Sequence, residues 1–122
     1  MVIDSSAILA IYFDEPTTDA VLACMRSADQ LVMSTVNLAE VLIRLHDRDP
    51  AMFEIQKRRL LEEPILFIPP DTAQATLAAN ARHRFPLNLG DCFAYALAKT
   101  QNLPLLTLDN DFRKTDVTVI RP

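Results

Sequence analysis

Short, mostly apolar segments alternate with longer helix-like segments along the chain, and this alternation constrains the fold more than any other feature of the sequence. The apolar segments lie at residues 2–3, 31–34, 65–68, 103–108 and 117–120. They lack the apolar–polar alternation of a strand that has one solvent-exposed face, so we predict that each is a buried strand. Strands of this kind with helices between them form a parallel sheet that helices cover on both faces.

Capping residues and prolines bound the helix-like segments. We predict helices over residues 7–13, 20–26, 36–48, 51–62, 72–84 and 91–102. Ser5 and Ser6 are suited to cap the first helix. Thr35 has the same position before the third helix, and Asp71 before the fifth. No linker or repeat divides the chain, so residues 1–122 are predicted to form a single domain.

The composition favours a folded protein without a membrane segment. Half of the residues are hydrophobic and 23% are charged, which favours a core over disorder. No apolar run approaches the ~18 residues of a membrane-spanning helix. The net charge of −4 argues against a protein that coats nucleic acid, but it allows an enzyme that holds a few phosphates through local basic patches and a bound cation. Cys24 and Cys92 have no CxxC partner, so we expect free thiols in a reducing cytoplasm.

Candidate acids follow the predicted strands near both ends of the chain. Asp4 comes directly after the first strand, and Asp109 and Asp111 come after residues 103–108. In a parallel sheet, ligands bind beyond the carboxyl ends of the strands at a switch in strand order, so we expect chemistry at these positions. The alternatives are a helix cap for Asp4 and an ordinary polar turn for the other two acids.

Glu40 lies on the predicted helix 36–48 among apolar residues. Its neighbours one turn away are Val36 and Ile43, so the carboxylate is predicted to lie on or beside a buried face. A buried carboxylate is costly unless it is paired, protonated or bound to a cation. The alternatives are a position at the rim or a salt bridge with Arg44 at i+4.

Asp91 follows Gly90, the only glycine in the chain. Average usage of glycine is about 7%, so a single glycine at this point indicates either a positive φ or a close approach of the backbone. The alternative is that Asp91 only stabilises the helix, because an acid in the first turn interacts favourably with the helix dipole. We interpret Asp91 as a functional residue because of the glycine beside it.

Brought together, these acids would form a carboxylate cluster. Unit charges ~4 Å apart repel by about 4 kcal/mol at an effective dielectric constant of ~20. Such a cluster persists only when it is protonated or binds a divalent cation. Oxygen ligands favour Mg²⁺ or Mn²⁺. With a phosphate as the partner, the expected chemistry is hydrolysis by a metal-activated water.

Four segments of the sequence resemble a known family. In their order and spacing, VIDSSAILAI, NLAEV, LNLGDCFAYALAK and PLLTLDNDF are similar to the PIN-domain ribonucleases, and most of all to the VapC-type toxins of bacterial toxin–antitoxin systems. The resemblance covers essentially the whole chain, and LGDCFAYALA is its most specific part. It implies a three-layer α/β/α fold with a central parallel sheet of about five strands. It also implies endonucleolytic cleavage of RNA that depends on Mg²⁺, for which Mn²⁺ is a possible substitute.

The resemblance implies roles for individual acids. Asp4 and Asp91 match the metal ligands of the family, and Glu40 matches a third acid. The fourth acid falls at Asp109 or Asp111, and the resemblance leaves both positions open.

Other parts of the chain are compared with the same toxins. Thr107 matches a position that is often Ser or Thr, and it is expected to support the site. The loop at residues 80–86 is shorter than usual, so part of the RNA-facing loop is expected to be missing. The basic groups are interpreted as solvated faces or as contacts with RNA phosphates. They are residues 57–59, residues 82–84, and the pair Arg44 and Arg48.

The resemblance further implies an RNA substrate, a cognate antitoxin that holds the protein inactive, and a homodimer. The lack of a long apolar run predicts no membrane contact. Two other classes of protein fit parts of the pattern. A catalytically silent PIN module would keep the fold and bind RNA or protein, but acids stand at every motif position. A receiver-like signalling domain would need paired acids after the first strand, where only Asp4 is present.

Overall fold

Five strands form one parallel sheet at the centre of the molecule. A computed structural model describes all residues from 1 to 122. The strands are β1 (Val2–Ile3), β2 (Leu31–Ser34), β3 (Ile65–Ile68), β4 (Leu105–Leu106) and β5 (Val119–Ile120). Their order across the sheet is β3-β2-β1-β4-β5, and every neighbouring pair is parallel. The predicted parallel sheet is confirmed.

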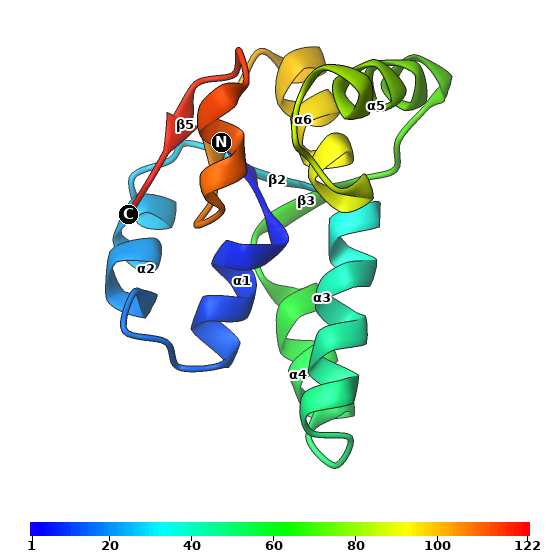
Figure 1. Ribbon diagram of the computed structural model, residues 1–122. Coiled ribbons are helices and arrows are strands. Elements are labelled where there is room, and N and C mark those ends of the chain that lie inside the picture. The colour runs from blue at the N-terminus through cyan, green and yellow to red at the C-terminus, as the bar shows by residue number, and fades with distance from the viewer.

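Helices cover both faces of this sheet (Figure 1). They are α1 (Ser5–Tyr12), α2 (Thr18–Arg26), α3 (Thr35–Arg48), α4 (Phe53–Glu62), α5 (Thr72–Arg84) and α6 (Leu89–Gln101), followed by a 3₁₀ helix, η1 (Asn110–Lys114). Helices α1 to α4 share one hydrophobic core with the sheet, and α5 and α6 share another. The three-layer α/β/α arrangement that the sequence predicted is confirmed.

Neighbouring residues of each inner strand point into different cores, because successive side chains of a strand lie on opposite faces of the sheet. The pairs are Val2 and Ile3, Val32 and Met33, and Leu105 and Leu106. In each pair the first residue packs with α5 and α6, and the second packs with the helices of the other layer. A strand buried on both faces has no polar side, which explains the continuous apolar segments.

The last two strands are shorter than predicted. They have two residues each instead of residues 103–108 and 117–120. At the end of α6, Asn102 adopts a left-handed conformation with φ 52°. The backbone N–H of Leu103 then bonds to the carbonyl of Ala98 at 3.0 Å. Leu103, which was predicted to begin the strand, therefore belongs to the end of the helix.

Five of the six helices begin within two residues of the predicted start, and only α5 begins at the predicted residue. Caps explain two of the differences. Ser34 rather than Thr35 caps α3, and its hydroxyl accepts an N–H of the first turn at 3.2 Å. Helix α6 begins at Leu89 instead of residue 91, because Asn88 caps it by accepting the N–H of Asp91 at 2.8 Å. Each cap is a polar residue one or more positions ahead of the predicted start.

Both cysteines have the state that the sequence predicted. Cys24 and Cys92 are free thiols, and Cys92 is buried within α6. None of the helices combines the length and the apolar character needed to cross a membrane.

The sheet changes strand order between β1 and β4. The chain passes from β1 outward through β2 to β3, and it then returns to the other side of β1 to form β4. Such a switch opens a crevice beyond the carboxyl ends of the two strands. The residues that follow directly are Asp4 after β1 and Thr107 after β4.

Candidate active site

Asp4 lies in this crevice and is 3% exposed. Its Oδ2 accepts hydrogen bonds from the hydroxyls of Ser6 at 2.7 Å and Thr107 at 2.9 Å, and from the backbone N–H of Ser6 at 3.4 Å. Asp4 itself therefore caps α1, and the prediction that Ser5 and Ser6 do so is wrong. Its Oδ1 accepts no hydrogen bond from the protein.

Glu40 reaches the same crevice from α3. Its Oε1 accepts hydrogen bonds from the Ser5 hydroxyl at 2.7 Å and the Asn37 amide at 2.8 Å, and its Oε2 accepts none. The residue is half-buried, so its predicted place beside a buried face is confirmed, although Ile43 one turn further on is 60% exposed. Arg44 forms no salt bridge with it, which removes that alternative.

Asp91 lies in the first turn of α6 and is 6% exposed. Its Oδ2 accepts the N–H of Asn88 at 3.2 Å, which completes a capping box, and its Oδ1 accepts no hydrogen bond. Burial, and after it the charge of Asp4, raises the pKa of Asp91 to about 7. Gly90 lies inside the helix with a negative φ, so of the two reasons predicted for this glycine the positive φ is excluded and the close approach of the backbone is left.

Asp109 and Asp111 have different environments. Asp109 faces the other acids, and its Oδ1 accepts the N–H of Asp111 at 2.8 Å, which caps η1. Asp111 is exposed and is not among the residues that line the crevice. The fully buried Phe112 anchors the turn. Of the two positions that the sequence left open, only Asp109 joins the other acids.

These four acids line one cleft of about 350 Å³, which we call the acid cleft. The other lining residues are Ser5, Ser6, Leu9, Ile43, Arg44 and Asn88. Burial raises the pKa of Asp4, and the charge of Glu40 adds to the shift. No basic side chain forms a salt bridge with any of the four carboxylates. The acid cleft therefore concentrates negative charge that the protein does not neutralise.

The comparison with known families identifies the fold. The family model described as PIN domain matches residues 1–117.

This chain belongs to the PIN domain family.

Among curated relatives, Ribonuclease VapC of Mycolicibacterium smegmatis is 36% identical over 129 residues, which cover 98% of this chain and 99% of the relative.

Solved structures share the architecture of this PIN domain. VapC20 of Mycobacterium tuberculosis, a Sarcin-Ricin loop cleaving toxin, superposes with a TM-score of 0.83 at 15% identity, covering 99% of this chain and 98% of its own. A toxin-antitoxin complex from Klebsiella pneumoniae gives a TM-score of 0.77 at 18% identity, over 98% and 94% of the two chains. At these identities the likeness shows the fold.

The supporting polar groups of this PIN domain were only partly predicted. The expected support from Thr107 is present as its hydrogen bond to Asp4. The contact between Asn37 and Glu40 was missed, although Asn37 stands three residues before Glu40, where a helix places side chains side by side. The two serines after β1 were interpreted as caps, whereas Ser5 binds Glu40.

Most basic residues of this PIN domain do not line the acid cleft. Arg48 lies over the Phe13 ring, 4.5 Å from its centroid, and Lys57 forms an ion pair within α4. Residues 82–84 are exposed on the last turn of α5. Arg44 is the one basic residue that lines the acid cleft, and it is exposed.

The carboxylates share a feature that suits a divalent cation. In each of the four acids, protein donors hold one oxygen, and the other oxygen accepts no hydrogen bond. Mg²⁺ prefers oxygen ligands and is bound through one or two carboxylates, while water and phosphate complete its coordination. No three acidic, histidine or cysteine groups converge into a preformed metal cage. The donor set therefore fits a cation that keeps much of its water.

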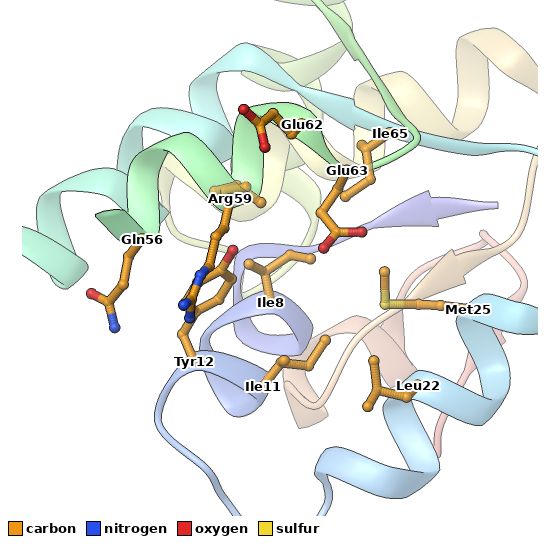
Figure 2. A pocket seen from close by; sticks show the side chains of 11 residues that line it. Ile8, Ile11, Tyr12, Leu22, Met25, Gln56, Arg59, Glu62, Glu63 and Ile65 are labelled. Carbon is orange, nitrogen blue, oxygen red and sulfur yellow. The ribbon is translucent and has the colours of Figure 1, made fainter. Parts of the chain in front are cut away.

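A second hollow, which we call the apolar groove, borders another face of α1 (Figure 2). Its volume is about 510 Å³, and α1, α2, α4 and the start of β3 form its walls. Ile8, Ile11 and Leu22 are among its apolar lining residues, while Arg59 and Glu63 add charge. Helix α1 therefore separates a charged cleft from an apolar groove.

Proposed function

We propose that this chain is a Mg²⁺-dependent endoribonuclease and the toxin of a type II toxin–antitoxin system. The observation that carries the proposal is the acid cleft, where four carboxylates each keep an oxygen free and none has a basic partner. The relative named Ribonuclease VapC, which is similar over nearly the whole of both chains, supports the activity. Mn²⁺ is expected to replace Mg²⁺, because both prefer oxygen ligands.

Asp4 and Asp91 are the residues that would hold the cation, because they are the most buried of the four acids and each keeps its Oδ1 free. When bound, the cation lowers the pKa of the attacking water and stabilises charge on the phosphate. Water adds to phosphorus as the bond to the leaving ribose oxygen breaks, and that oxygen takes up a proton from solvent to leave as a hydroxyl. Glu40 and Asp109 are placed to orient this water and to receive its proton.

Arg44 is suited to hold the RNA backbone beside the acids. It lines the acid cleft, it is exposed, and no carboxylate pairs with it. A guanidinium binds phosphate oxygens through two parallel hydrogen bonds. One such contact at the cleft lets a chain with a net charge of −4 hold a phosphate locally.

The test is cleavage of total RNA by purified chain that is free of any bound partner. The wild type with Mg²⁺ is compared with Asp4→Asn and with a sample that contains EDTA. We expect discrete products from the wild type alone. Cleavage that survives Asp4→Asn would contradict the assigned site. No cleavage of several RNAs with Mg²⁺ or Mn²⁺ would overturn the enzymatic function in favour of a PIN module that only binds.

We propose that the antitoxin binds in the apolar groove. The structural neighbour from Klebsiella pneumoniae is a toxin-antitoxin complex, which supports a partner of this kind. Grooves between helices bind the apolar face of an amphipathic helix. Because α1 borders both hollows, a single antitoxin segment can continue from the groove to the acid cleft.

The variant Leu22→Asp tests this seat, with Ile55→Asp as the matched control on an exposed position outside the groove lining. We expect Leu22→Asp to lose the co-purified antitoxin while it keeps RNA cleavage. Equal antitoxin binding by both variants would contradict the proposal. The homodimer and the cytoplasmic location stay predictions.

A further inference from the structure

Gly90 needs an explanation other than backbone freedom, because it lies inside α6 with a negative φ. A Cβ atom built at this position would lie within 3.0 Å of all three atoms of the Glu40 carboxylate group, closer than real Cβ atoms come to other atoms. The only glycine of the chain therefore makes the space that the Glu40 carboxylate occupies. A larger residue in this place would exclude the carboxylate.

Asn37 holds the same carboxylate in this space. Its amide nitrogen donates to Glu40 Oε1 at 2.8 Å and to the carbonyl of Gly90 at 3.0 Å. The Asn37 side chain is fully buried, so its N–H groups cannot form hydrogen bonds with solvent water instead. One amide thus connects the acid of α3 to the backbone of α6, while Ser5 of α1 donates to the same oxygen.

We infer that Gly90 and Asn37 are positioning residues that set the place of the Glu40 carboxylate in the acid cleft. The catalytic consequence rests on the proposed function, whereas the steric link does not. The carboxylate is the far end of a flexible side chain, so alanine at position 90 displaces the carboxylate rather than unfolding the chain. The displaced acid then leaves the Ser5 hydroxyl and one N–H of the buried Asn37 amide without the acceptor that Glu40 provides.

Thermal unfolding without divalent metal tests the steric link. The four proteins are the wild type, Gly90→Ala, Glu40→Ala and the double variant. Alanine favours a helix over glycine, so with Glu40 removed we expect Gly90→Ala to raise Tm by about 3 °C. With Glu40 present we expect no such gain, because the carboxylate must move. The same change in Tm in both backgrounds would overturn the inference.

RNA cleavage gives a second readout. We expect Gly90→Ala to lower kcat as far as Glu40→Ala does, and the double variant to be no slower than either. The isosteric Asn37→Asp, which replaces a donor with a like charge, should lower kcat with little change in KM. Wild-type cleavage by Gly90→Ala would overturn the positioning role. If no variant and no wild type cleaves RNA, the proposed function fails, while the melting comparison still decides the steric link.

Discussion

Two carboxylates beside helix α6 have opposite environments. At the start of the helix, Asp91 keeps one oxygen without a donor, and burial raises its pKa to about 7. Beside the later turns, Asp116 accepts hydrogen bonds from the Tyr95 hydroxyl at 2.7 Å and the Lys99 ammonium at 3.1 Å. The bond from Tyr95 above all lowers the pKa of Asp116.

The difference separates a structural acid from one that is kept for a ligand. Asp116 joins the segment before β5 to α6, and its neighbours compensate its charge. Asp91 stands among other acids, and no basic side chain pairs with it. Uncompensated charge of this kind lowers the stability of the folded chain, and a bound cation would remove that cost.

The largest effect is expected from Asp4→Asn, which should separate activity from stability. We predict that RNA cleavage falls at least about 100-fold, because a cation ligand is lost. The metal-free variant should melt at the wild-type temperature or above it, because burial disfavours the charged form of Asp4. Cleavage assays and thermal unfolding of one preparation measure both. A variant that melts well below the wild type would place Asp4 with the structural acids.

The next effect sharpens the choice of the fourth acid. Asp109→Asn should slow cleavage by about 10-fold, because its carboxylate lines the acid cleft. Asp111→Asn should stay within about twofold of the wild type, because this side chain is exposed and outside the lining. The two variants are matched in chemistry and are compared by initial rates. The reverse order of rates would assign the role to Asp111.

The pH dependence of stability is expected to follow Asp91. Its folded pKa of about 7 lies above its ordinary value of 3.8. Between these values the folded state holds a proton that the unfolded state releases, so the metal-free chain should lose stability as pH rises from about 4 to about 7. Thermal unfolding across this range should show the fall in the wild type and a smaller fall in Asp91→Asn, in which the raised pKa of Asp4 still contributes. A wild-type Tm that rises over this range would contradict the assignment.

Mg²⁺ should act in the opposite direction, because it needs the ionised carboxylate. At ten times its Kd the ion would stabilise the chain by about 1.4 kcal/mol. We expect this gain in Tm near pH 8, and a smaller gain near pH 6, where Asp91 is protonated. Equal gains at both pH values would show that Asp91 is not a ligand.

The smallest effect is expected at the structural acid. Asp116→Ala should lower stability by about 1 kcal/mol, because the hydroxyl of the buried Tyr95 loses its acceptor. Asp116→Asn keeps an acceptor and is the matched control, with a smaller loss. Cleavage by both variants should stay at the wild-type rate. A folded Asp116→Ala protein without activity would remove the distinction between the two carboxylates.

The fold and the general place of the site were predictable because they depend on local rules. Strands without a regular polar face indicated a parallel sheet, and the switch rule then pointed to the residues after β1 and β4. Asp4 was found from its place after a strand, and Glu40 from its apolar surroundings. Asp91 was found through the glycine beside it, for which the structure shows the predicted close approach and not the predicted alternative of a positive φ.

The remaining details depend on how side chains from different elements meet. Asp109 caps η1 and lines the acid cleft, whereas Asp111 lies within η1 and does not line it. The spacing of the two acids in the sequence does not predict this difference. The reason for Gly90 is the packing of α3 against α6, which brings the carboxylate of Glu40 over its Cα atom. The length of β4 depends on how α6 ends at Asn102.

The most direct test is whether the acid cleft binds a divalent cation through its free oxygens. We would soak crystals of the chain in Mn²⁺ and locate the ion by anomalous diffraction. We predict a strong peak in contact with Asp4 Oδ1 and Asp91 Oδ1, and no such peak in crystals of Asp4→Asn. An empty acid cleft at saturating Mn²⁺, or a peak only elsewhere on the protein, would contradict the metal-dependent site.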